Sequence, residues 1–331
     1  MNRDIKRIAI VRLSALGDIV NTAVVLQFIK KEYPNVVIDW ITEEAFAPLL
    51  QGHPLLNVVH TVNLKKLKKQ KSFSYLKETI SKLRSLGEFD VVLDIQGLLK
   101  SAIVARLVGK NTHGYDSDSA RESLAALLYK TTSNIAYDES IVKRNAFVAA
   151  DGLSFTIDDK MLLEKSAIFP FEKLDSFSDT QKNIAIVIGA SWESKKYPKE
   201  LVVKLCNELK ENALIIWGSE QEREEGSWIC KNSDYATLAP KMSLSELVSY
   251  ISNCDLLIGN DTGPTHMAWA QNIPSITLFG PTNQRMIYKT ECNVGIESPS
   301  KVNIFKIDKS DFSIKEILPQ SIVTKAKELL Q

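Results

Sequence analysis

Short apolar runs alternate with amphipathic stretches in the first half of the chain. The run Arg7-Ile-Ala-Ile-Val-Arg12 is typical of a buried strand, and the segment 19–33 has apolar residues at helical spacing and stops at Pro34. The same order continues beyond this point, with strands predicted at 36–41, 58–62 and 89–94 and helices at 43–51, 73–86 and 98–107. Such alternation indicates a parallel sheet with helices on both faces.

The alternation lapses between residues 151 and 182, where proline, serine and aspartate are frequent, and then restarts. The run Asn183-Ile-Ala-Ile-Val-Ile-Gly189 closely repeats the first predicted strand. Later strands are predicted at 213–217, 254–258 and 273–279, and later helices at 220–230, 243–252, 265–271 and 314–330. We therefore predict an α/β protein with two similar doubly wound parallel-sheet domains, at 1–160 and 183–312, joined by a linker at 161–182 and followed by a terminal helix at 313–331. Ligands of such sheets bind at the carboxyl ends of the strands, so the two domains are expected to face a cleft.

Composition and charge exclude several classes of protein. The chain has 331 residues, of which 44% are hydrophobic and 24% charged, as in soluble globular proteins. Its formal net charge of +1 gives no general attraction for nucleic acid, and no apolar run reaches the roughly 18 residues of a membrane span. The N-terminus lacks the apolar core of a signal peptide. The four cysteines are far apart and the histidines lack metal-ligand spacing, so we expect reduced cytoplasmic thiols and no metal site.

The stretch 259–270 carries the strongest candidate chemistry. Asp261, Thr262 and Gly263 form a turn between a predicted strand and a predicted helix. The free N–H groups and the positive dipole end at the start of such a helix bind anions such as phosphate. Asp261 or Thr262 can instead simply cap the helix, which is the commoner arrangement. His266 lies one turn into the helix, and Gly280-Pro-Thr282 follows the next strand; both favour the phosphate interpretation.

Other candidates follow strands of the second half. Ser191 and Lys195 lie in a loop before a helix that is expected to start near Pro198, which suits a diphosphate, although a solvated loop is the alternative. Glu222 lies where an acid can accept a hydrogen bond from a ribose hydroxyl, or it is a surface charge. Met242 can cover a base ring, although methionine more often fills a core.

The first half offers one carboxylate and several cations. Asp18 follows the first strand and can act as a general base toward a substrate hydroxyl, while its position alone favours a helix cap. Gly17 stands without the G-x-G-x-x-G pattern, which gives little support to a dinucleotide dehydrogenase. Arg121 can bind an anionic acceptor or lie on the surface. Five lysines in the seven residues 65–71 predict a solvated loop, or one attracted to phosphate groups or an anionic membrane.

Together these motifs resemble the lipopolysaccharide heptosyltransferases, and most closely their type I members, over nearly the whole chain. The motifs that carry the resemblance are Ser14-Ala-Leu-Gly-Asp18, Asp94-Ile-Gln-Gly-Leu-Leu-Lys-Ser101, Ser119-Ala-Arg-Glu-Ser-Leu-Ala-Ala-Leu-Leu-Tyr129, Lys195 with Tyr197-Pro198, Trp217-Gly218, Pro240-Lys-Met-Ser-Leu244, Asp261-Thr-Gly263, His266 and Gly280-Pro-Thr282. There are two departures. The family's hydroxyl pair is represented by Ala190-Ser191, and Asn260-Asp-Thr-Gly-Pro264 is also similar to type II members.

The resemblance implies a GT-B fold of two Rossmann-like domains. The C-terminal domain would bind the donor, ADP-L-glycero-β-D-manno-heptose, and the N-terminal domain the acceptor, Kdo2-lipid A, with the C-terminal helix returning to the N-terminal domain. Heptose would pass with inversion to Kdo in the synthesis of the lipopolysaccharide inner core. ADP-heptose would be a substrate, and no cofactor or metal is implied. The expected enzyme is a cytoplasmic monomer in peripheral contact with the inner face of the inner membrane.

The resemblance also implies roles for the candidate residues. Asp18 matches the base, and Ser191, Lys195 and the 261–263 turn, with His266, match the donor site. Glu222 and Met242 match the ribose and adenine contacts, and Arg121 an acceptor contact, with Lys65, Lys66 and Lys68 as weaker candidates. The alternatives are a type II enzyme acting on an already heptosylated acceptor, another nucleotide-sugar reaction on the same twin-domain fold such as epimerisation, and a non-catalytic nucleotide-binding or membrane-surface protein.

Overall fold

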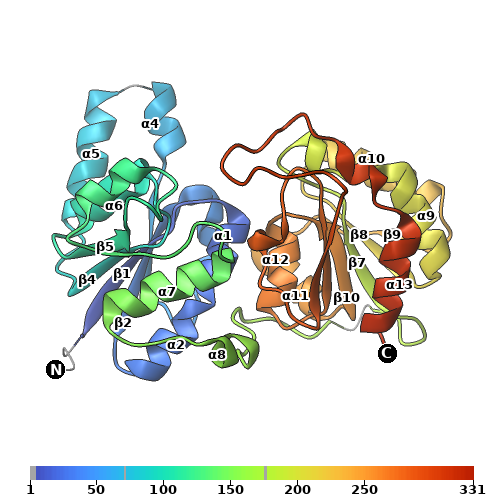
Figure 1. Cartoon of the computed structure of the whole chain (residues 1–331), viewed down its shortest axis with the longest axis horizontal. Coiled ribbons are helices and arrows are strands. Elements are labelled where there is room, and N and C mark those ends of the chain that lie inside the picture. Colours follow the sequence, from blue (N-terminus) through green and yellow to red (C-terminus); the bar gives the residue numbers. More distant parts are fainter. Residues whose placement is uncertain (1–4, 71, 175–176) are drawn as a thin grey trace. The chain divides into compact units, whose positions relative to one another are not determined.

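The computed structural model describes residues 5–70, 72–174 and 177–331, and its internal contacts divide the chain into two units, Met1–Lys165 and Ser166–Gln331. The division falls within the predicted linker, and most of that segment, from residue 166 onward, goes with the second unit. Both units contain a six-stranded sheet in which every pair of neighbouring strands is parallel, with helices on its two faces (Figure 1).

The sheet of the first unit has the order β3-β2-β1-β4-β5-β6. Its strands are β1 (Arg7–Val11), β2 (Val37–Glu43), β3 (Val58–Val62), β4 (Val91–Asp94), β5 (Thr112–Tyr115) and β6 (Thr131–Ser133). Its α-helices are α1 (Leu16–Ala23), α2 (Val25–Glu32), α3 (Ala47–Leu50), α4 (Leu64–Gln70), α5 (Phe73–Arg84), α6 (Leu99–Val108), α7 (Ile141–Leu153) and α8 (Asp159–Leu163). Strand β1 is apolar and almost wholly buried because both faces of a parallel sheet are covered.

The first unit corrects two predictions about local structure. The lysine-rich segment forms helix α4 over Leu64–Gln70, so the predicted loop is wrong there, and Lys71 lies outside the described residues. Lysine is a good helix former, and a short helix exposes its charges as well as a loop does. The single helix predicted at 19–33 is two consecutive helices, α1 and α2, which meet at Val24.

The second unit repeats the strand order of the first. Its sheet reads β12-β11-β10-β7-β8-β9, so each sheet, numbered within its own unit, has the doubly wound order 3-2-1-4-5-6. Its strands are β7 (Asn183–Val187), β8 (Asn212–Ile216), β9 (Ala236–Leu238), β10 (Leu256–Asn260), β11 (Ser275–Phe279) and β12 (Asn293–Glu297). Its α-helices are α9 (Lys199–Leu209), α10 (Glu220–Lys231), α11 (Leu244–Ser252), α12 (Gly263–Ala270) and α13 (Pro319–Leu329). The predicted tandem of doubly wound parallel-sheet domains is confirmed.

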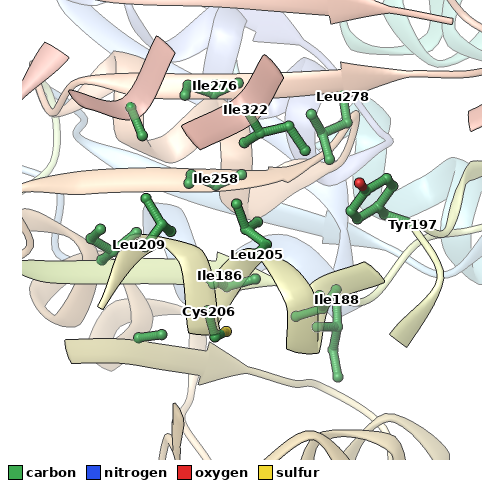
Figure 2. Packing of buried hydrophobic residues seen from close by; sticks show 14 of the residues in the cluster. Ile186, Ile188, Tyr197, Leu205, Cys206, Leu209, Ile258, Ile276, Leu278 and Ile322 are labelled. Carbon is green, nitrogen blue, oxygen red and sulfur yellow. The ribbon is translucent and has the colours of Figure 1, made fainter. Parts of the chain in front are cut away.

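The terminal helix α13 packs on the second unit, so the expected return to the N-terminal domain is wrong. Ile322 of α13 is fully buried in the same apolar cluster as Leu205 and Cys206 of α9 and Ile258 and Ile276 of the sheet (Figure 2). Burying an isoleucine side chain stabilises a fold by about 1.5–3 kcal/mol, and α9 with the sheet offers a continuous apolar surface for it. The four cysteines are free thiols, two of them buried.

Candidate active site

The predicted anion site lies where the strand order of the second unit reverses. Strands β7 and β10 are parallel neighbours, and the chain leaves their carboxyl ends toward opposite sides of the sheet. The segments that follow them, 188–198 and 261–263, carry Lys195 and Asp261. Ligands of open α/β sheets bind at this switch point because the two loops diverge there and leave room between them.

Asn260, the last residue of β10, ties these two loops together. Its fully buried carboxamide donates hydrogen bonds to the carbonyls of Ile188 and Gly189, at 3.1 and 3.2 Å, and accepts one of 3.0 Å from the N–H of Tyr197. This role of Asn260 was not predicted from the sequence, where the residue is only part of a motif. The available signal was an amide at the end of an otherwise apolar strand, since a buried amide needs partners for its donors and its acceptor.

Four side chains converge beside the start of α12. The Nζ of Lys195 lies 2.7 Å from Oδ2 of Asp261, His266 Nε2 lies 3.1 Å from Oδ1, and the hydroxyl of Thr282 donates to Oδ2 at 2.9 Å. All four residues are buried. Burial by itself would raise the pKa of Asp261, but Lys195 and His266 outweigh it and hold that pKa well below the ordinary value of 3.8. Asp261 is therefore an ionised anchor for its neighbours.

The capping alternative for Asp261 and Thr262 is wrong. Thr262 occupies the N-cap position of α12 but makes no side-chain cap, and the carboxylate of Asp261 is engaged with Lys195 and His266. The second helical residue is Pro264, which has no N–H group. The first turn of α12 therefore presents backbone N–H groups that no side chain caps, next to a lysine ammonium that has two further N–H donors beyond the one directed at Asp261. This arrangement can bind an anion.

The other predicted donor-side residues lie at the same edge of the sheet. Glu222 closes the capping box of α10, accepting hydrogen bonds from the N–H groups of Gly218 and Ser219 at 2.7 and 3.1 Å. It also lies against the loop that follows β7, because a Cβ added at Gly189 would come within 2.5 Å of its Oε1. Ser191 is exposed after β7, and Met242 is half-buried between β9 and α11, outside the fully buried core.

In the first unit, Asp18 lies just after β1 as the third residue of α1. The N-cap residue is Ala15, so Asp18 is not the cap, although its Oδ2 accepts a hydrogen bond of 3.2 Å from the N–H of Ala15. The guanidinium of Arg12 lies 2.8 Å from its Oδ1 and also donates to the carbonyl of Ile95. Arg12 is buried, while the side chain of Asp18 is 27% exposed. Arg12 and the N–H of Ala15 thus orient the carboxylate of Asp18, which remains accessible to a ligand. Arg12 was not predicted from the sequence as the partner of Asp18.

A buried network supports the loop that carries Asp18. Asp94, at the end of β4, is fully buried, and its pKa is raised by that burial in spite of hydrogen bonds from the hydroxyl of Tyr129 at 2.7 Å and the N–H of Gln96 at 2.8 Å. The side chain of Gln96 in turn accepts a 2.8 Å hydrogen bond from the N–H of Leu13. The motif at 94–101 therefore fixes the backbone between β1 and α1.

Comparison with known proteins decides the family. Residues 79–301 match the model of glycosyltransferase family 9 (heptosyltransferase). The chain belongs to this family. It is 39% identical to lipopolysaccharide heptosyltransferase 1 of Campylobacter coli, over 98% of each chain. Its structure is similar to that of Escherichia coli heptosyltransferase WaaC with ADP, with a TM-score of 0.80 and 24% identity over 98% of this chain and 99% of that one. It is also similar to the structure of Escherichia coli WaaC with ADP-2-deoxy-2-fluoro heptose, with a TM-score of 0.80 and 23% identity over 97% of this chain and 99% of that one. The GT-B type of fold is confirmed.

The remaining predicted residues of this glycosyltransferase are exposed cations on the first unit. Arg121 is exposed on a loop whose backbone is held by Arg144, which donates to the carbonyl of Ser119 at 2.5 Å. Among the described residues Arg121 forms no ion pair. Lys65, Lys66 and Lys68 are exposed on α4, and the Nζ of Lys66 lies 4.8 Å from the centre of the Tyr75 ring. Within the described residues, no ion pair or hydrogen bond links these lysines to the loop that carries Asp18.

The described part of the chain offers neither a cluster of potential metal ligands nor a membrane-spanning helix. Residues 5–70, 72–174 and 177–331 contain no group of three or more His, Cys, Asp or Glu that could hold a metal ion. No helix built from those residues is long and apolar enough to cross a bilayer. What these residues do assemble is a buried cluster of Lys195, Asp261, His266 and Thr282 at a helix start in the second unit, and an oriented carboxylate in the first.

Proposed function

We propose that this family 9 glycosyltransferase transfers L-glycero-D-manno-heptose from its ADP derivative to the Kdo of Kdo2-lipid A, with inversion, during synthesis of the lipopolysaccharide inner core. The similarity to the type 1 enzyme of Campylobacter coli over 98% of both chains carries this proposal. The structural similarity to WaaC with ADP-2-deoxy-2-fluoro heptose supports the choice of donor.

The second unit supplies what a departing ADP needs. Breaking the sugar bond leaves negative charge on the diphosphate, and groups placed to meet that charge lower the barrier. We assign this role to Lys195 and to the uncapped start of α12 at 261–263, with Asp261, which also contacts His266, holding Lys195 in place. Ser191 would add a hydroxyl to the diphosphate, Glu222 would accept a hydrogen bond from the ribose, and Met242 would cover the adenine.

The first unit supplies the base. An inverting displacement needs one group to take the proton from the attacking acceptor hydroxyl. Asp18 is the candidate, because its carboxylate is partly exposed and oriented by Arg12 and by the N–H of Ala15. Arg121, exposed and without an ion-pair partner among the described residues, would bind a negatively charged group of the acceptor.

The acceptor and location are further parts of the proposal. Lysines of α4 are exposed on the first unit, as are the large apolar side chains of Phe73, Leu124 and Leu127. Basic residues together with exposed apolar ones favour an anionic lipid surface. We therefore place the enzyme, as a monomer, in the cytoplasm at the inner face of the inner membrane, with Lys65, Lys66 and Lys68 toward the acceptor phosphates.

An assay of ADP release tests the proposal. Release from ADP-heptose in the presence of Kdo2-lipid A, with formation of the heptosylated product, is the expected result. Turnover only with an already heptosylated acceptor would assign the chain to type II instead. Conversion of the nucleotide sugar without any acceptor would point to a reaction such as epimerisation, and binding without turnover to a non-catalytic protein.

A further inference from the structure

The segment 299–312 is a long connection between β12 and the short helix η5 (Ser313–Glu316), drawn in red in Figure 1. Its two ends are closed against each other. The hydroxyls of Ser298 and Ser313 lie 2.7 Å apart, and the hydroxyl of Ser300 donates to Asp311 Oδ2 at 2.6 Å. Between these closures, most residues from 301 to 310 are exposed and none forms a helix or strand. We call this segment the 299–312 flap.

The base of the flap stands against the Lys195–Asp261 cluster. Ser298 donates its N–H to the carbonyl of Phe279 at 2.8 Å, at the end of β11. At the next residue, Gly280, an added Cβ would come within 2.8 Å of the Cβ of Ile314 and 3.3 Å of the carbonyl of Ser194. Two residues further on, Thr282 donates to Asp261. The flap therefore begins and ends beside the residues that we assign to the donor.

One lysine of the flap turns back onto the donor loop. The Nζ of Lys309 lies 4.6 Å from the centre of the Trp192 ring, and the Nζ of Lys195 lies 5.5 Å from the same ring. A cation near an aromatic face is attracted by it, so this cation–π contact with the indole fixes the position of the Lys309 ammonium. Trp192 is the residue just before η3 (Glu193–Lys195), the short helix that carries Lys195.

The lysines near this site differ in how their charge is balanced. Lys195 is paired with Asp261 at 2.7 Å, and Lys196 with Glu193 at 2.7 Å and Glu225 at 3.7 Å. Lys309 forms no ion pair with any carboxylate of the described residues. Its chain neighbour Asp308 is turned toward Ser310, accepting hydrogen bonds from its N–H and hydroxyl at 2.8 and 2.6 Å. A diphosphate is attracted most by a cation whose charge is not already balanced.

We propose that Lys309 is a second cationic residue for the donor diphosphate, carried onto the site by the flap and seated on Trp192. This inference rests on the proposed function and deepens it. Lys195, fixed by Asp261, gives the buried and geometrically defined contact. Lys309 gives an unbalanced positive charge at the edge of the site, where it attracts the nucleotide and balances the charge on ADP as the sugar bond breaks.

Calorimetric titration of ADP and steady-state kinetics with ADP-heptose test this role in the full-length enzyme. Because Lys309 is exposed, we expect Lys309→Ala to weaken ADP binding by about 5- to 10-fold at low ionic strength, and by only about 2-fold in high salt. The fall in kcat/KM for ADP-heptose should be at least as large, while the KM for acceptor stays unchanged. Lys309→Arg should recover most of the loss.

Matched variants separate the role of Lys309 from general charge. Lys306→Ala removes another exposed lysine of the same flap and should leave ADP affinity within about 2-fold of the parent. Trp192→Leu should reproduce part of the Lys309→Ala loss by removing the seat, and Trp192→Phe should retain binding. Parent-like ADP affinity and kcat/KM in Lys309→Ala at low salt overturn the inference, as does an equal loss in Lys306→Ala.

Failure of this inference is distinguishable from failure of the proposed function. The parent enzyme is first assayed for ADP release with Kdo2-lipid A. A parent that transfers heptose, together with an unaffected Lys309→Ala, removes only Lys309 from the donor site. A parent that neither binds ADP nor releases it from ADP-heptose overturns the proposed function and this inference with it.

Discussion

Replacing Lys195 with methionine tests whether the Lys195–Asp261 pair is a buried, structural ion pair as well as a donor contact. Methionine keeps an unbranched apolar stem and removes the ammonium. In the parent the two side chains are 10% and 2% exposed and their charged atoms are 2.7 Å apart. Among the described residues, the variant leaves the carboxylate of Asp261 with His266 and Thr282 as its side-chain hydrogen-bond partners.

The expected loss of stability follows from this burial. Removing one partner of a buried ion pair costs about 3–5 kcal/mol, because the other charge is left without compensation. Because two hydrogen bonds to Asp261 remain, we expect Lys195→Met to lower the free energy of unfolding by about 3 kcal/mol. For a unit of this size, each kcal/mol lowers the melting temperature by about 2–4 °C, which gives a fall of roughly 6–12 °C in the transition of the second unit.

The pH dependence of stability tests the contribution of Asp261. In the parent, the pKa of Asp261 is depressed, so its contribution is fully present above the ordinary value of 3.8 and is lost as the pH falls through the lower folded value. Thermal scans of the parent at pH 6 and pH 8 should therefore show no change from this source. Lys195→Met removes the ammonium that lowers this pKa, so the stability of the variant should change less than that of the parent as the pH falls below 3.8.

A second substitution separates stability from binding. Lys195→Met with Asp261→Asn removes both charges and should recover at least half of the lost stability, because no charge is left buried and unpaired. It should not recover ADP affinity, which we expect to fall by about 10- to 150-fold in both variants when a charge-assisted contact is lost. A stability loss below about 1 kcal/mol in Lys195→Met, or a double variant no more stable than the single one, would refute the buried-pair reasoning. Parent-like ADP affinity would remove Lys195 from the diphosphate site.

Three other predictions address the base, the basic helix and the packing at the site. Asp18→Asn should bind ADP like the parent but lose about 10²–10⁴-fold in kcat, and turnover within about three-fold of the parent would exclude Asp18 as the base. Replacing the lysines of 65–71 with glutamine should raise the acceptor KM at low ionic strength and much less at high salt, with no change in ADP affinity; an unchanged KM would make α4 an ordinary solvated helix. Gly280→Ala should cost about 1–3 kcal/mol of stability because its Cβ would meet Ile314 at 2.8 Å, whereas Gly218→Ala, which meets Glu222 at an ordinary 3.5 Å, serves as the control; equal melting temperatures of the two variants would contradict this.

The order of strands and helices could be predicted from the sequence because the signal is local. Apolar runs such as 7–12 and 183–189 are continuous, since both faces of a parallel sheet are covered, and each is followed by amphipathic residues at helical spacing. Motif residues such as Asp18 and Asp261 directly follow strands, and parallel strands end at the same edge. Their placement at the carboxyl edge of a sheet was therefore predictable.

The pairing of these residues was decided only by the tertiary structure. Asp261 was open between a helix cap and a phosphate contact because the choice depends on Lys195 and Thr282, which are 66 and 21 positions away in the chain. Arg12 and the carboxamide of Asn260 were missed for the same reason, since their partners come from other segments.

The packing partner of the terminal helix could likewise not be predicted from the sequence. Its apolar stripe predicted a buried face, but periodicity specifies no partner. Only the folded chain shows that α9 and the sheet of the second unit provide the matching apolar surface for Ile322. The local pattern thus determines the secondary structure and the sheet edge at which a residue lies. Ion-pair partners and packing partners come from distant segments, so only the folded chain determines them.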